Sequence, residues 1–375
     1  MRDHETAART LVDRADELPF GPGQVALYEE AVALADSHSD EELAFELRRE
    51  MLWPAYHGNR PDLLLVHFAW CLAYLDRHPE APPLDLLWQY RWVVDTMPAF
   101  AGVTRGHIDA AWADMRDRYQ AGGWSLRPVW LLRRRILCDM GDLAGAADAH
   151  RRYVRCRADA LSDDAGQDVA FAVDYQALLK RDKPTLRAAA PFLDGRITDP
   201  HLVIGFVDDA LLALTRTGRA EEAHAWQKRA ARLIAARPQF LGGSDNHLVF
   251  LTAVGDYAGA ARFFDRNFTP ALAEPGEFTQ LTTYKAALFF ARRLAAAGRT
   301  RVNLKVPENL IPGADGPRCR PGPLRDWLEA ALPKVCRRAD ARNGNTYYTD
   351  GLADLAGYDR LAAALAPRSS GAADA

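Results

Sequence analysis

The chain has 375 residues, of which 49% are hydrophobic and 26% charged, and its formal net charge is −3. This composition excludes a disordered polar chain, and the slightly acidic balance does not favour a nucleic-acid-binding domain. The N-terminus is charged and lacks the apolar core of a secretory signal. The longest apolar stretch, residues 63–75, is shorter than the roughly 20 residues that span a bilayer. We therefore expect a cytoplasmic protein with no membrane segment.

The cysteine and arginine content supports this expectation. The five cysteines, at positions 71, 138, 156, 319 and 336, form no CxxC pair. Such spacing predicts free thiols in a reducing compartment and neither a zinc site nor a disulfide framework. Only six of the 47 basic residues are lysine, and alanine is abundant, a skew typical of a bacterial protein from a GC-rich genome.

Helical periodicity dominates the chain from its start to about residue 300. Apolar residues recur at i, i+3, i+4 and i+7, and no run of alternating β-branched residues appears, so we predict an all-α protein. The predicted apolar helical stretches are 25–34, 43–53, 63–75, 84–94, 129–138, 169–179, 202–214, 248–254 and 281–294.

Turn residues divide these stretches into pairs. Gly141, Gly218, Gly255 and Gly298 each follow an apolar helical stretch, and a glycine there can end a helix because it tolerates a positive φ. Taking one break per helix pair, the breaks recur about every 36 to 44 residues, the length that two helices and two short turns need. This predicts a right-handed α-solenoid of about seven helical hairpins over residues 1–305.

The glycine turns also carry a sequence motif. Gly255-Asp256-Tyr257 is followed by Ala260 and Phe264. Two further copies are Gly141-Asp142-Leu143 with Ala146, preceded by Trp130, and Gly218-Arg219-Ala220 with Ala223 and Ala230. Over residues 127–298 the chain resembles the tetratricopeptide repeat family, a fold of stacked helical hairpins.

Three features depart from that family's pattern. The period is longer than 34 residues, Arg133 and Arg134 stand where a core leucine and a small residue belong, and no second helix is expected after Gly298. We therefore expect a degenerate, tetratricopeptide-like solenoid.

The resemblance implies that the first helices of successive hairpins line a concave binding groove. The residues that it places in this groove are Arg135, Asp208, Asp209, Asp245, Asn246, Lys285, Phe289 and Arg292. Members of the family that bind chaperone tails hold a terminal carboxylate with lysine and asparagine side chains. Because acidic residues stand at several of those positions here, the resemblance implies a ligand of mixed or positive charge.

Three functions are compatible with the sequence. The first is a non-enzymatic scaffold that binds a protein or peptide, for which lysine at both Asp208 and Asp209 would weaken binding without unfolding the chain. The second is a peptide-sensing regulatory solenoid that controls a transcription factor or kinase. The third is an all-helical magnesium-dependent diphosphate enzyme, because Phe206-Val207-Asp208-Asp209 resembles the aspartate pair of isoprenoid enzymes. That chemistry needs several convergent carboxylates, and Leu212 stands where the third would fall.

Aromatic and basic residues cluster in the N-terminal half. Seven of the nine tryptophans, at positions 53, 70, 88, 92, 112, 124 and 130, fall within 78 residues. We expect most of them to fill the core, with Trp88 and Trp92 the first candidates for an aromatic groove. Residues 127–157 carry eight basic and three acidic side chains, and we interpret them as a solvated helical surface in preference to a phosphate-binding one.

The C-terminal part differs in composition. Residues 306–323 contain five prolines and three glycines, which predicts a linker or an extended segment across the last hairpin. Residues 324–366 are expected to form a helical cap and residues 367–375 a disordered tail. We find no nucleotide-binding, metal-binding or nucleophile motif, so no cofactor is predicted, and the sequence indicates no oligomeric state.

Overall fold

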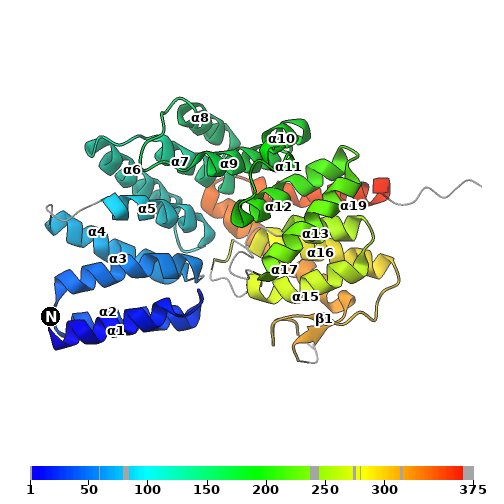
Figure 1. Ribbon diagram of the computed structural model, residues 1–375. Coiled ribbons are helices and arrows are strands. Elements are labelled where there is room, and N and C mark those ends of the chain that lie inside the picture. Colours follow the sequence, from blue (N-terminus) through cyan, green and yellow to red (C-terminus); the bar gives the residue numbers. More distant parts are fainter. Residues whose placement is uncertain are drawn as a thin grey trace, which may run out of the picture. The chain divides into compact units, whose positions relative to one another are not determined.

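The computed structural model describes residues 2–58, 60–78, 84–236, 245–272, 276–278, 280–312 and 316–365 (Figure 1). Nearly all regular structure in these residues is helical, which confirms the predicted all-α class. The chain forms two compact units. Unit 1 comprises Met1–Asp163 with Pro275–Phe278, and unit 2 comprises Asp164–Glu274 with Thr279–Ala375. This division falls inside residues 1–305, where the sequence predicted one continuous array.

Unit 1 is a succession of helices in which each packs on the next: α1 on α2, α2 on α3, and so on to α8 (Figure 1). In addition, α5 contacts both α3 and α7. Its elements are α1 (Asp3–Asp16), α2 (Pro22–Ser37), α3 (Glu41–His57), α4 (Pro61–Arg77), α5 (Leu84–Thr96), η1 (Met97–Ala99), α6 (Arg105–Ala121), α7 (Arg127–Asp139) and α8 (Leu143–Tyr153).

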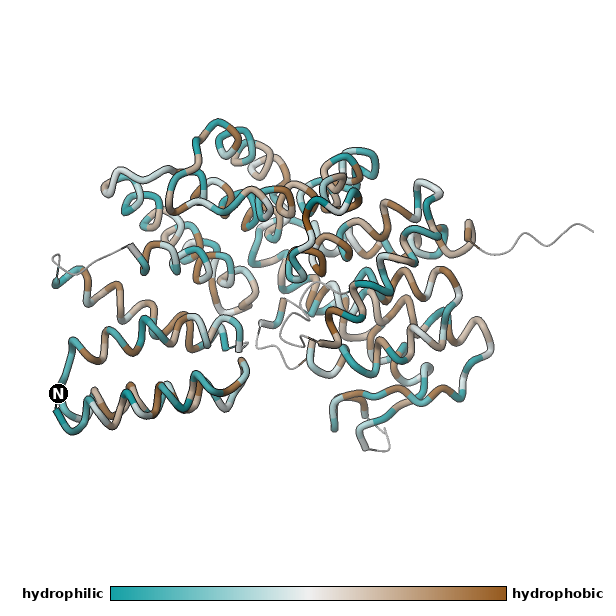
Figure 2. Tube along the Cα trace, in the orientation of Figure 1, coloured by the Kyte–Doolittle hydropathy of each residue, from teal (hydrophilic) through white to brown (hydrophobic). Residues whose placement is uncertain are grey.

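The core of unit 1 confirms the expected role of most tryptophans. Trp112 is buried, and five others pack against the same hydrophobic cluster from partly buried positions: Trp70, Trp88, Trp92, Trp124 and Trp130. Figure 2 shows hydrophobic residues recurring along these helices between hydrophilic ones. Trp53, with 43% of its surface exposed, is the exception, whereas the sequence singled out Trp88 and Trp92.

A distant tripeptide completes unit 1. Phe278 donates its backbone N–H to the carbonyl oxygen of Ala99 at 3.0 Å, and Ala101 donates its N–H to the Glu277 carboxylate at 2.8 Å. Phe278 is 8% exposed. The loop that follows η1 is therefore held by residues more than 170 positions later in the chain.

Unit 2 continues the alternation of helices and short turns. Its elements are α9 (Ala165–Leu178), α10 (Asp182–Ala188), α11 (Ala190–Leu193), α12 (Pro200–Arg216), α13 (Ala220–Ala236), α14 (Asp245–Ala253), α15 (Tyr257–Leu272), α16 (Gln280–Ala296), β1 (Leu304–Lys305), β2 (Arg318–Cys319), α17 (Pro321–Asn343), α18 (Tyr347–Asp350), η3 (Gly351–Ala353) and α19 (Asp354–Leu365). The pairs α12/α13, α14/α15 and α16/α17 pack internally, and the first helices α12, α14 and α16 pack on one another. This arrangement agrees with a stack of hairpins.

The glycine turns have the predicted conformation. Gly141, Gly218, Gly255 and Gly298 all adopt positive φ angles, between 68° and 81°. After Gly255, the Asp256 side chain caps the next helix by accepting the N–H of Gly259 at 2.8 Å. The alanines five positions after three of these glycines are completely buried: Ala146, Ala223 and Ala260. Small side chains at these positions let the second helices approach closely.

The proline-rich segment is packed against unit 2, which corrects the linker interpretation. Leu304 and Lys305 pair with Cys319 and Arg318 in a two-residue antiparallel ladder, and β1 contacts α15. Lys305 donates its N–H to Asp265 of α15 at 2.6 Å. The alternative expectation, an extended segment across the last hairpin, fits these contacts.

A further correction concerns the helix after that segment. The sequence assigned no second helix to the hairpin that ends at Gly298, and placed residues 324–366 in a cap. Instead α17 packs on α16 as its partner, and α19 supplies the cap. The predicted disordered tail, residues 367–375, lies outside the described residues.

We expect Gly255→Ala to lower the free energy of unfolding of unit 2 by about 1–2 kcal/mol, the cost of holding an L-residue at positive φ. No atom lies within 4 Å of the added Cβ, so steric clash does not contribute. Gly205→Ala, in the exposed interior of α12, is the control and should stabilise by about 0.5–1 kcal/mol. The measurement is urea dependence of amide hydrogen exchange in α14 and α15. Equal effects of the two substitutions would contradict the assignment of a positive φ to Gly255 as the source of the destabilisation.

Candidate functional site

Seven of the eight predicted groove residues lie in unit 2, on the three first helices. Asp208 and Asp209 belong to α12, Asp245 and Asn246 to α14, and Lys285, Phe289 and Arg292 to α16. The remaining residue, Arg135, lies on α7 of unit 1, where it is paired with Asp95 of α5 at 2.8 Å. The first-helix face of unit 2, formed by α12, α14 and α16, is therefore the candidate site.

Asp208 is a helix-capping residue, which corrects its assignment to an open groove. It is 6% exposed. One carboxylate oxygen accepts the backbone N–H groups of Asn246, at 3.0 Å, and His247, at 3.3 Å, and the other accepts the Asn246 side-chain amide at 3.1 Å. The carboxylate of α12 thus satisfies the unpaired N–H groups that begin α14.

Burial, followed by the nearby carboxylate of Asp245, raises the pKa of Asp208 well above its ordinary value. Lysine at this position would leave the first turn of α14 uncapped and bury an ammonium group. The expectation that lysine at Asp208 and Asp209 would leave the fold intact is therefore wrong for Asp208. Asp209, the next residue, is only partly buried.

Asp245 makes a different link one helix later, to side chains and not to backbone N–H groups. Its carboxylate accepts side-chain hydrogen bonds from Thr282 and Thr283 in the first turn of α16. Burial raises its pKa, while these hydroxyls and the charge of Lys285 act in the opposite direction. Two of the three predicted aspartates, Asp208 and Asp245, therefore connect consecutive first helices and do not supply free negative charge to a ligand.

The C-terminal helix α19 packs on α14 and α16, over this face. Asp354, its first residue, pairs with Lys285 of α16 at 3.1 Å and with Lys180, which follows α9. One turn later, the ring of Tyr358 lies 5.4 Å from that of Phe289. Phe289 is itself only 1% exposed, so it is part of the buried interface and not of an open groove.

The electrostatics of this interface favour an acidic helix start. Burial alone would raise the pKa of Asp354, but its contacts with Lys180 and Lys285 outweigh burial and hold the pKa below its ordinary value. Burial and the carboxylates of Asp354, Asp245 and Asp208 raise the pKa of Tyr358 and keep its hydroxyl protonated. The predicted ligand was of mixed or positive charge, and the positive alternative loses support here, because Lys180 and Lys285 of this face contact the Asp354 carboxylate.

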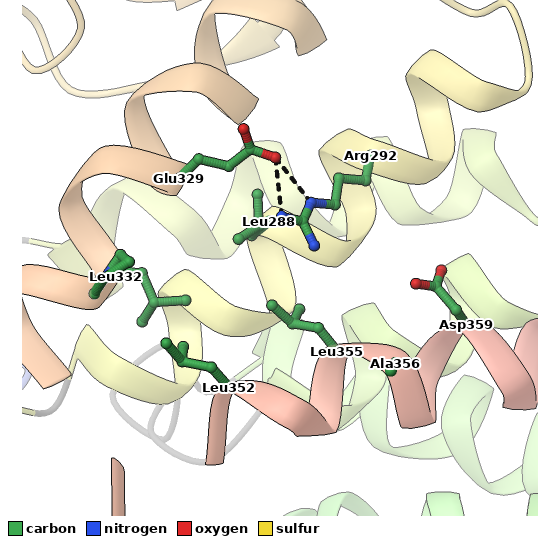
Figure 3. A pocket seen from close by; sticks show the side chains of 9 residues that line it. Leu288, Arg292, Glu329, Leu332, Leu352, Leu355, Ala356 and Asp359 are labelled. Atoms are coloured by element: carbon green, nitrogen blue, oxygen red, sulfur yellow. Dashed lines mark hydrogen bonds and ion pairs between the residues drawn. The ribbon is translucent and has the colours of Figure 1, made fainter. Parts of the chain in front are cut away.

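A pocket of about 530 Å³ lies beside this interface (Figure 3). Leu288 of α16, Leu332 of α17, Leu352 of η3 and Leu355 of α19 give it apolar walls. Arg292, the last predicted groove residue, lines it and is ion-paired with Glu329 at 2.9 Å. The pocket therefore combines a hydrophobic interior with a charged edge, the usual chemistry of a site for an apolar side chain.

Sequence reasoning missed two residues of this site, Asp354 and Tyr358, because a short C-terminal amphipathic helix carries no sign of where it docks. It also missed His247, which is completely buried and stacks on Phe263 with ring centres 5.4 Å apart. Neither ring nitrogen of His247 has a hydrogen-bond partner among the described residues. Burial lowers its pKa to about 3.

No family model and no curated protein matches this sequence. The resemblance to tetratricopeptide repeats therefore stays a prediction from the sequence of the glycine turns. Within the described ranges, no three His, Cys, Asp or Glu side chains are placed to hold one metal ion. The helices in those same ranges are too short or too polar to cross a bilayer.

The burial of His247 predicts a pH-dependent stability. In the unfolded chain the imidazole binds a proton near pH 6.5, whereas in the folded chain it stays neutral to about pH 3. Its contribution is therefore complete above pH 6.5 and is lost as the pH falls, by about 2 kcal/mol between pH 8 and pH 5. His247→Leu should reduce the pH dependence of the unfolding free energy by that amount, measured by urea denaturation. A wild-type and variant difference that does not change with pH would contradict this.

Proposed function

We propose that this protein is a non-enzymatic, helical-repeat scaffold that binds a protein or peptide segment through the first-helix face of unit 2. The observation that supports this is the docking of α19 on α14 and α16. That face already binds a short amphipathic helix through an ion pair and an aromatic contact, and a pocket lies beside this helix. It thus has the features with which grooves bind amphipathic helices.

The chemistry of the contacts defines the ligand. Lys285 and Lys180 select a carboxylate at the start of the helix, where the helix dipole also favours negative charge. Phe289 selects an aromatic side chain one turn later, as it contacts Tyr358. Leu355, between these anchors, forms one wall of the pocket that Leu288 and Leu332 also line. We infer a ligand of the form acidic, apolar, x, x, aromatic.

The second candidate function is a peptide-sensing regulatory solenoid, and one observation favours this hypothesis. Because α19 covers the face, an external helix must displace it before binding, and exposure of α19 would then report the ligand. The hypothesis of a diphosphate enzyme gains no support, because both oxygens of Asp208 accept hydrogen bonds from residues in the first turn of α14. Magnesium could bind there only by breaking them.

A cytoplasmic location remains part of the proposal and is supported by the thiols. All five cysteines are free, and four of them are buried. Burial raises the pKa of Cys319 and Cys336 to about 11, which keeps these groups in the unreactive thiol form. Such cysteines suit a reducing compartment.

The test uses full-length Asp354→Lys, in which the new charge faces Lys285 and Lys180 and repels α19 from its site. A fluorescent peptide with the sequence of residues 352–365 should bind this variant with a Kd of about 1–100 µM. It should bind the wild-type chain at least about tenfold more weakly, because the tethered α19 competes at a high effective concentration. Fluorescence anisotropy measures both affinities.

The matched control is the same peptide with lysine in place of its aspartate, which should bind Asp354→Lys at least about tenfold more weakly than the native peptide. Circular dichroism establishes whether the variant is folded. A folded Asp354→Lys chain that binds neither peptide would show that α19 is only a packing element, and the proposal for this face would fail.

A further inference from the structure

A second pocket, of about 700 Å³, lies in unit 1 and has a different chemistry. It is formed where α1 ends, α2 begins and α3 ends. Phe20 and Trp53 provide aromatic walls, and Gln24 and Tyr28 of α2 line it with polar atoms. Asp16 contributes a carboxylate, whereas the carboxylate of Glu50 is paired with Arg9 at 3.1 Å. None of the predicted groove residues belongs to it.

The aromatic wall extends beyond the pocket. Trp53 lies with its ring centre 6.4 Å from Phe20 and 5.1 Å from Trp92, and Tyr56 stacks on Trp92 at 5.3 Å. Trp53 is 43% exposed and Tyr56 37%. Large aromatic rings that line a pocket and remain exposed are typical of a contact surface.

Among the described residues, Trp53 is one of four tryptophans without an arginine over the ring, together with Trp92, Trp124 and Trp327. Five tryptophans carry an arginine guanidinium over the ring, at 4.2 to 5.0 Å from the ring centre. These pairs are Arg48 with Trp70, Arg91 with Trp88, Arg133 with Trp112, Arg152 with Trp130, and Arg229 with Trp226. Over the exposed ring of Trp53, the described part of the chain places no arginine or lysine, and the His57 ring lies beside it with ring centres 4.1 Å apart.

The polar groups of the pocket favour a cation there. The Asp16 carboxylate accepts the Tyr28 hydroxyl at 2.9 Å and forms no ion pair with any described residue. Arg49, the basic residue of the lining, is directed to Asp85 at 2.9 Å. The surrounding residues 1–50 carry 13 acidic and five basic side chains, so the local potential is negative.

Gln24 adds an unpaired acceptor. Its side chain is only 5% exposed, and its Oε1 has no hydrogen-bond partner among the described atoms. A buried carbonyl oxygen without a donor is costly, and an N–H group entering the pocket can remove that cost.

We propose that this pocket binds a basic side chain of a partner peptide, with the guanidinium or ammonium over the Trp53 ring and its N–H groups directed to Asp16 and Gln24. Trp53 supplies cation–π attraction, Asp16 the opposite charge, and Phe20 a wall for the aliphatic stem. Guanidinium suits the site better than ammonium, because its flat face can stack on the indole while its edge donates hydrogen bonds. This site is independent of the unit 2 face.

The test compares butylguanidinium with butylurea, a neutral molecule of nearly the same shape, on the full-length wild-type chain. Chemical shifts of the Trp53 indole N–H, followed by NMR during titration, report occupancy of this pocket. Butylguanidinium should bind at least about tenfold more tightly than butylurea, because only the charged molecule gains the cation–π and carboxylate attractions. Butylammonium as a third ligand measures the preference between the two cations.

Variants separate the contributions of the ring and the charge. Trp53→Leu, which keeps an apolar side chain, should lower butylguanidinium affinity at least about tenfold, and Trp53→Phe by only about threefold. Asp16→Asn should lower it about three- to tenfold, whereas Asp13→Asn, on the same helix but outside the pocket, should leave it within about twofold. For the Trp53 variants, binding is followed from the ligand signal by saturation transfer.

Equal binding of butylguanidinium and butylurea to the wild-type chain would overturn the proposal, even if a variant failed to fold. Unchanged affinity in a folded Trp53→Leu chain would overturn it as well. Neither outcome depends on the peptide experiment with Asp354→Lys, because that experiment concerns the other unit.

Discussion

The interaction on which unit 2 depends is the hydrogen bonding of a carboxylate on one first helix to the first turn of the next. Asp208 of α12 holds the first N–H groups of α14, and Asp245 of α14 accepts the threonine hydroxyls that begin α16. Each bond fixes where the next helix starts and how it is rotated. These are the properties that position Lys285 and Phe289 under α19. Removal of one carboxylate would therefore affect the helices that follow it, and with them the binding face.

The two candidate sites differ in how much of their apolar surface is covered. In unit 2 the face is covered by the chain's own C-terminal helix, so its aromatic group, Phe289, is buried and its lysines are neutralised by Asp354. In unit 1 the aromatic rings around Trp53 are left accessible. The first site is suited to exchange between helices, and the second to direct binding of a side chain.

The helical stretches and the glycine turns could be predicted from the sequence because their causes are local. A glycine at positive φ followed by a capping aspartate, as at Gly255 and Asp256, is determined by a few adjacent residues. The close packing of the second helix at Ala260 could be predicted for the same reason. The role of Asp208 could not, because its partners, Asn246 and His247, lie 38 and 39 residues later. The periodicity of a helix does not distinguish an exposed aspartate from one that is buried by a distant segment.

The site residues show the same limit. Lys285 was expected to contact a ligand, and it does contact a helix, but the contact residue Asp354 lies 69 positions away in a segment expected to be only a cap. Phe289 was assigned to the groove from its register, which gave its helix face correctly and its burial incorrectly. Register identifies the face of a helix, but only the completed tertiary structure determines what covers that face.

The dependence of unit 1 on Glu277 and Phe278 has a consequence for synthesis on the ribosome. The N-terminal helices emerge first, yet the residues that hold the loop after η1 follow Asp163 by about 115 positions. At translation rates of about 5–20 residues per second, that delay lasts roughly 6 to 23 seconds. During this interval the nascent chain carries the aromatic surface of unit 1 without the hydrogen bonds from Glu277 and Phe278. A chaperone could associate with the chain in that period.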